Sequence, residues 1–237
     1  MAFKGTLFMS PERVIFGCGV VDDIGTYVKQ LGGIKPFIAT DKIIFAIDAF
    51  QRIEDSFKKD NIDYYLYAIS AIKRIFKYLG RAIANGRDME AREQMLLGAM
   101  EAGFAMNTGC ALIHSSGLQL TSKFGLSHGE TLAIMASPVM RFNTMACVER
   151  MIDIAKAMAE NVQGLGKLDA AYIAAEAVQK FAQSIEVPTH LNRQKHDPGL
   201  IPQMAQTAIS NDNTHGNPRI PSQAQLEALY RQAYSDL

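Results

Sequence analysis

The 237-residue chain is 48% apolar and carries 24 basic against 24 acidic side chains, a size and composition that suit one or two packed domains. Because neither charge is in excess, the sequence lacks the basic bias that nucleic acids or anionic membranes select, and we expect neither as a partner. Three scattered cysteines without a CxxC pair, and no apolar run of membrane-spanning length, predict a cytoplasmic protein without a disulfide scaffold.

The first 67 residues alternate between strand-like and helix-like segments. The strand-like runs are residues 6–11, 13–17, 35–40 and 62–67, and the helical ones are 20–31 and about 50–57. Alternation at this spacing predicts a parallel α/β unit over residues 1–67.

From residue 68 onward the pattern is helical throughout. The predicted helices are 68–86, 88–106, 110–125, 128–142, 148–161, 168–185, 199–210 and 222–235. Asp88, Ser127 (with Glu130 three residues on) and Ser222 have the side chains and positions of N-terminal caps. The sequence therefore predicts an all-α domain over residues 68–237.

Two of the five histidines stand fourteen positions apart in this helical part. His114 lies inside one predicted helix and His128 at the start of the next, so both rings can reach a shared cleft. Neutral imidazole is a common ligand of iron and zinc. On spacing alone, a capping or packing role for His128 stays open beside a metal site.

The surrounding residues resemble a known signature. His114 is followed by His128-Gly129, Pro138 and Phe142-Asn143 in the order found in iron-containing alcohol dehydrogenases, where a helical His precedes a His-Gly pair by fourteen residues. Further segments are similar to other parts of that family: residues 8–25, 38–42, 86–107, 149–158, 185–191 and 217–219. The resemblance thus extends over nearly the whole chain.

This resemblance implies a dehydroquinate synthase-like architecture, with a partial Rossmann-like α/β unit before the helical domain. It further implies Fe(II) or Zn held by His114 and His128, and NAD or NADP as cofactor, with Asp41 at the adenosine ribose. The implied reaction is hydride transfer between a small primary alcohol or aldehyde and nicotinamide. A homodimer is also implied, and the catalytic base stays unassigned.

The chain also departs from the family pattern. A Gly-Gly-Gly-Ser phosphate-binding turn, and an Asp and a first His ligand, have no counterpart, as if about a third of a family member were missing between Tyr67 and Ala68. Asp48 and Arg52 have the spacing of those ligands, but the second is Arg. Leu118 stands where the family often has another His.

Three interpretations follow. The chain is a working metal- and NAD-dependent oxidoreductase, a non-catalytic relic that acts as a structural or interaction protein, or two joined segments of a longer chain.

Other chemistry-bearing residues favour structural roles. Gly17, Gly19 and Gly25 lack the spacing of a dinucleotide fingerprint and predict a turn. Cys110 is interpreted as a small buried apolar residue. The remaining histidines are interpreted as exposed loop residues: His190, His196 and His215.

Overall fold

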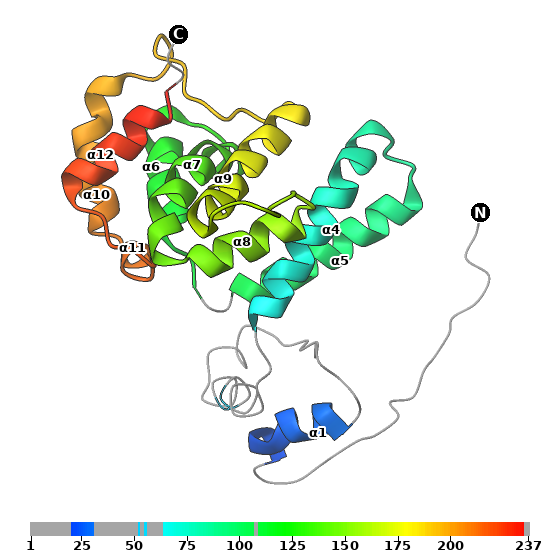
Figure 1. The fold of residues 1–237 in the computed structure, drawn as a ribbon. Helices are drawn as coiled ribbons and strands as arrows, with labels where there is room; N and C mark the ends of the chain where they lie inside the picture. Colours follow the sequence, from blue (N-terminus) through cyan, green and yellow to red (C-terminus); the bar gives the residue numbers. More distant parts are fainter. Residues whose placement is uncertain (1–19, 31–51, 53–54, 56–63, 107–108, 235–237) are drawn as a thin grey trace. The chain divides into compact units, whose positions relative to one another are not determined.

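The computed structural model describes residues 20–30, 52, 55, 64–106 and 109–234. The chain divides into two compact units, Met1–Asp63 and Tyr64–Leu237 (Figure 1). Within the described ranges the regular elements are all helices, and β pairing is limited to one bridge between Leu191 and Tyr234. None of these helices combines the length and apolar character needed to cross a membrane.

In the first unit, the helix predicted over residues 20–31 is confirmed where the structure describes it. A 3-10 turn, Val20–Asp23, leads into α1, Ile24–Gln30. Arg52, itself helical, donates two hydrogen bonds to the Asp22 carboxylate, with N–O distances of 2.6 and 2.5 Å. The strand-like runs predicted at 6–11, 13–17 and 35–40, and with them the Rossmann-like sheet, lie outside the described residues.

The strand predicted over residues 62–67 is wrong in its described part. Residues from Tyr64 onward form the first turn of α4, Tyr64–Ala84, which continues without interruption through Tyr67 and Ala68. Tyrosines favour strands locally, but Tyr67 is buried against Phe104, with ring centroids 5.3 Å apart. Tertiary packing therefore overrides the local preference.

The helices α4 and α5, Met89–Ala105, lie side by side as a hairpin (Figure 1). Asp88 caps α5 as predicted, because its carboxylate accepts a hydrogen bond from the Ala91 amide at 3.0 Å. Arg81 of α4 binds the same carboxylate. The cap thus also joins the two helices at their turn.

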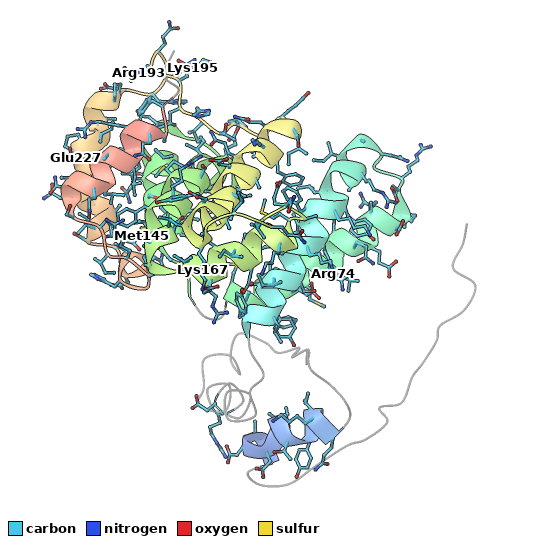
Figure 2. All side chains as sticks on the ribbon, in the orientation of Figure 1. Arg74, Met145, Lys167, Arg193, Lys195 and Glu227 are labelled. Carbon is cyan, nitrogen blue, oxygen red and sulfur yellow. The ribbon has the colours of Figure 1, made fainter. Side chains whose placement is uncertain are left out.

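Polar side chains join the two helices at the other end of the hairpin as well. The buried Glu101 carboxylate accepts hydrogen bonds from Ser70 Oγ at 2.9 Å and from Arg74 Nε at 3.1 Å (Figure 2). Arg74 also binds Gln94. A charge with 6% of its surface exposed is therefore fully paired.

Apolar side chains occupy both faces of α5. On the inner face, a methyl group at Gly98 would lie 3.3 Å from Ile75 Cγ1. On the outer face, Leu96 is 74% exposed. The exposed large apolar side chains of the hairpin are Leu66, Ile83, Met89, Leu96, Met100 and Met106. Charged side chains of α5, Glu90 and Arg92, are exposed as well, so its outer face is mixed in character.

The main hydrophobic core lies among α6 (Leu112–Phe124), α7 (His128–Asn143), α10 (Ile201–Ile209) and α12 (Gln223–Gln232). Its largest fully buried side chains are Leu112, Leu120, Ile134, Met135, Leu191, Met204, Leu226 and Tyr230. These helices lie within a few residues of the predicted ones, and Ser222 caps α12 through a capping box.

A second apolar cluster joins α8, Val148–Ala157, to α9, Lys167–Ser184. Alanines of α9 let the two helices approach closely: Ala170, Ala171 and Ala174 are almost fully buried. Short turns complete the helical unit: the 3-10 segments Thr144–Ala146 and Pro198–Leu200, and α11, Asp212–His215.

Tyr65 joins α4 to α8. Its hydroxyl donates to Asp153 at 2.7 Å, and the Arg150 guanidinium lies 3.6 Å from its ring centroid. Burial, followed by the hydrogen bond to Asp153, raises the pKa of Tyr65 to about 12. The tyrosine therefore stays protonated and holds the hairpin against the rest of the helical unit.

Candidate functional site

His114 is the third residue of α6. The helix begins after an extended residue, Ala111, whose carbonyl accepts from the amides of His114 and Ser115 at 2.9 and 3.2 Å. The helix ends at Gly125, whose φ of +68° favours glycine. His114 is half-buried, because its first-turn neighbours Leu112 and Ser115 face the core.

His128 is the first residue of α7 and is exposed. Ser127 and Glu130 form the predicted capping box: the Glu130 carboxylate accepts from the Ser127 amide at 2.9 Å, and the Glu130 amide donates to Ser127 Oγ at 3.4 Å. The hydrogen bonds from Ser127 lower the pKa of Glu130. The capping box fixes the start of α7 and therefore the backbone position from which the His128 side chain projects.

The two histidine rings come together as the sequence predicts. Their centroids lie 5.3 Å apart with the planes tilted by 56°. Burial, and secondarily the charge of His128, lower the pKa of His114. The fold therefore favours the neutral imidazole at His114, which is the form that binds a metal.

The donor chemistry of this pair fits iron or zinc in part. Two neutral imidazoles are suitable ligands for either metal, whereas a catalytic site usually carries three protein ligands. In the ranges that the structure describes, no group of three or more His, Cys, Asp or Glu side chains is arranged to hold a metal ion. A catalytic metal bound by this pair would therefore need at least one further protein ligand.

Buried hydrogen bonds hold the first turns of α6 in place. The Thr214 hydroxyl lies 2.7 Å from Ser115 Oγ and 2.6 Å from the Ala208 carbonyl. Tyr230, fully buried, donates its hydroxyl to the Ser116 carbonyl at 3.0 Å. The residues that follow His114 are therefore fixed by α10, α11 and α12, through pairs that the sequence does not reveal.

The far end of α7 is held by a pair of amides. Asn143 and Asn217 exchange two hydrogen bonds, of 2.9 and 2.7 Å. Arg219 donates to the Phe142 carbonyl at 3.1 Å and lies over the Phe142 ring. These residues belong to two segments of the family resemblance. The 217–219 turn holds the end of the helix that begins at His128.

Two of the remaining histidines are not the exposed loop residues that the sequence predicts. His190 is half-buried, with one ring nitrogen 3.1 Å from Gln179 and the other 3.0 Å from the Thr189 hydroxyl, beside a pocket of about 190 Å³. His196 stacks on Phe124, with ring centroids 5.0 Å apart. His215 is exposed, as predicted, but it is the last residue of α11 and not a loop residue.

Other predicted site residues stay apart from the pair. Leu118, four residues after His114, is 40% exposed and carries no proton relay. Arg52 is engaged with Asp22. Asp41 and Asp48 lie outside the described residues. Cys110, expected to be a small buried apolar residue, is half-buried.

Comparison with known families gives one assignment that covers most of the chain. The model of the Fe-containing alcohol dehydrogenase family, C-terminal region, matches residues 41–234.

Curated proteins that are similar in sequence are also alcohol dehydrogenases. The chain is 34% identical over 168 residues to the 1,3-propanediol dehydrogenase of Klebsiella pneumoniae, which covers 70% of this chain and 43% of that protein. It is 30% identical over 207 residues to the NAD-dependent methanol dehydrogenase of Bacillus methanolicus, covering 87% and 53%. The chain therefore spans about half the length of the curated relatives that it matches.

Solved structures share the fold. The crystal structure of a 1,3-propanediol oxidoreductase aligns with a TM-score of 0.69 at 34% identity, over 71% of this chain and 44% of that one. An alcohol dehydrogenase from Oenococcus oeni aligns with a TM-score of 0.68 at 29% identity, over 70% and 44%.

Proposed function

Because the chain belongs to the Fe-containing alcohol dehydrogenase family, as its sequence resemblance predicts, we propose that it functions as a metal-dependent oxidoreductase of small primary alcohols and aldehydes. NAD, or NADP, is the hydride acceptor and donor. The names of the relatives, a 1,3-propanediol dehydrogenase and an NAD-dependent methanol dehydrogenase, support this substrate class and cofactor.

The observation that carries the proposal is the convergence of two histidines from different helices. His114 and His128 are fourteen residues apart, yet their ring centroids lie 5.3 Å from each other. A structural role for His114 alone explains its half-burial but not the matching position of the exposed His128. A shared Fe(II) or Zn ion accounts for both.

The two histidines have different tasks in the proposed reaction. Half-burial keeps His114 in the neutral, electron-donating form, while the exposed position of His128 leaves one side of the pair open to a substrate. His114 and His128 would hold the metal, which would supply Lewis acidity at the substrate oxygen, and nicotinamide would supply the hydride chemistry. Glu130 is engaged in the helix cap and is not the catalytic base.

The nucleotide side of the proposal rests on the first part of the chain. We assign the first unit to a partial nucleotide-binding α/β domain in a dehydroquinate synthase-like architecture, with Asp41 at the ribose, and the second to the metal-binding helical domain. The boundary expected between residues 67 and 68 moves to Asp63 and Tyr64, because α4 begins at Tyr64. A homodimer in the cytoplasm completes the proposal. Light scattering on the purified chain tests the dimer, and a Asp41→Ala variant that binds NAD as tightly as the wild type contradicts the ribose role.

The decisive experiment is metal analysis after anaerobic purification without chelators. Wild type is compared with His114→Ala/His128→Ala, and with His215→Ala as a matched control at an exposed histidine. We expect near-stoichiometric iron or zinc in the wild type and in the control, and none in the double variant. Thermal unfolding verifies that each variant is folded.

An assay with NAD and short primary alcohols follows. Turnover that the double variant loses and the control keeps supports the oxidoreductase. Wild type with no more metal than the double variant overturns the proposal and returns the chain to the alternative of a non-catalytic structural or interaction protein.

A further inference from the structure

The helices α6 and α7 are in close contact at Gly117. This glycine is fully buried, and a methyl group placed on it would lie 3.2 Å from Thr131 Oγ1 and 3.2 Å from Leu132 Cδ2. Its φ is not in the left-handed region, so backbone conformation does not require glycine here. Glycine inside a helix costs about 0.5–1 kcal/mol relative to alanine, and here the missing side chain makes room for Thr131.

Both contacting residues stand close to the histidines. Gly117 comes three residues after His114, and Thr131 three residues after His128, so each lies on the same side of its helix as the histidine one turn earlier. The Thr131 hydroxyl donates to the His128 carbonyl at 2.8 Å. Thr131 therefore connects the backbone of His128 directly to the surface of α6.

The distance between α6 and α7 at this contact thus helps to determine the distance between the His114 and His128 rings. Zinc binds imidazole nitrogen at about 2.0–2.1 Å, so two rings can share one ion only within a narrow range of separations. Sites of this kind depend on supporting residues that hold the ligands to within roughly 0.5 Å. A methyl group at Gly117 would require the Thr131 and Leu132 side chains of α7 to give way by a few tenths of an ångström next to the rings.

We propose that Gly117 and Thr131 form a spacer, the Gly117–Thr131 spacer, that positions His114 and His128 to bind one metal ion. Both are positioning residues, since neither supplies a metal-binding atom in this role. The inference rests on the proposed function of the two histidines.

A size-exchange experiment on the full chain tests the spacer. Gly117→Ala displaces the side chains of Thr131 and Leu132 that contact α6. We expect Zn²⁺ affinity, measured by competition with a chromophoric chelator, to fall about tenfold. Gly117→Ala/Thr131→Ala removes the obstructing hydroxyl, but it also removes the hydrogen bond to the His128 carbonyl and leaves Leu132 Cδ2 in place. Affinity should therefore recover only in part, to within about threefold of wild type. The matched control is Gly103→Ala on α5, where an added methyl meets nothing within 4 Å.

A metal-free measurement separates this inference from the proposed function. With selectively labelled histidines, cross-relaxation between the ring hydrogens of His114 and His128 reports their distance. Gly117→Ala should weaken that signal, and the double variant should restore it.

The outcomes are distinct. A wild type that shows the ring contact but does not bind Zn²⁺ overturns the metal site, and the ring signals of the variants then decide on the spacer. If Gly117→Ala changes neither affinity nor ring contact, or if the double variant is as impaired as the single one, the spacer is wrong. Unfolding midpoints of all variants identify any loss that comes from a damaged fold, and recovery in the double variant excludes that explanation.

Discussion

The α6–α7 pair and the α4–α5 hairpin are both built from two packed helices, but different interactions hold them. The α6–α7 pair buries Leu120, Met135 and Val139 completely and has its backbone fixed by the buried hydroxyls of Thr214 and Tyr230. The hairpin is joined by ionic groups around Glu101 and Asp88, and it exposes large apolar side chains on the outer face of α5.

This difference in packing matters because the α6–α7 pair carries the two histidines, whose separation must be precise if they bind one ion. Two rings that share an ion must keep a fixed separation, and dense apolar packing with satisfied buried polar groups provides rigidity of that kind. The ion pairs of the hairpin each include a partly exposed arginine, Arg74 or Arg81, and such pairs stabilise a helix pair without fixing it to tenths of an ångström. The candidate site therefore lies on the pair with the better-packed interior.

The α6–α7 pair and the α4–α5 hairpin should differ most in the stability that is lost when a leucine in each is replaced by alanine. Leu120→Ala in α6 leaves a cavity in a fully buried position, and we expect it to lower the free energy of unfolding by about 3 kcal/mol. Leu96→Ala in α5, 74% exposed, should change it by less than about 0.5 kcal/mol. Urea unfolding measures both, and equal losses would show that the outer face of α5 is covered in solution.

The next effect concerns the ionic attachment of the hairpin. Arg74→Met leaves the buried Glu101 carboxylate without its cation, and we expect a loss of about 2 kcal/mol in stability. Arg92→Met, at an exposed position of α5, is the control. The ionic description of the hairpin fails if the two variants unfold at the same urea concentration.

A smaller effect is expected from one hydroxyl in the site-bearing region. Tyr230→Phe keeps the ring in the core but leaves the Ser116 carbonyl without its donor, at a cost of about 1 kcal/mol. Tyr78→Phe is the matched control, because that half-exposed hydroxyl lies 3.5 Å from Glu90. A Tyr230→Phe protein as stable as the wild type would mean that the buried hydroxyl does not hold α12 to α6.

The smallest expected effect is a dependence on pH. Since burial and the charge of His128 lower the pKa of His114, the neutral ring is favoured in the folded state. The associated stability is complete above the unfolded-state pKa of about 6.5 and is lost as the pH falls through the folded-state value. NMR titration of the metal-free protein checks the direction. His128→Asn should raise the pKa of His114 only partly, because burial is the larger cause.

The local part of this structure could be predicted from the sequence. Asp88, Ser127 and Ser222 cap helices where their positions indicate, because a cap depends on three or four consecutive residues. The convergence of His114 and His128 was predictable for a similar reason: the two helices that carry them are consecutive and joined by a short turn.

What could not be predicted depends on residues far apart in the chain. Thr214 meets Ser115 across 99 positions, and no local pattern marks either residue. The turn at Tyr64–Tyr67 is helical because of Phe104 and Asp153, which the tyrosines themselves do not reveal. His190 and His196 looked exposed among polar neighbours, until the fold placed Gln179 and Phe124 against them.

The reciprocal amides at the end of α7 have a consequence for the chemical ageing of the protein. Asn143 and Asn217 each donate and accept, so conversion of either to Asp would set two acceptors against each other about 3 Å apart and break the pair. Asparagine usually deamidates when the next backbone nitrogen attacks the side-chain amide. Asn217, the more buried residue of the two, is followed by Pro218, whose nitrogen carries no hydrogen. This half of the contact is therefore protected from the commonest route of deamidation.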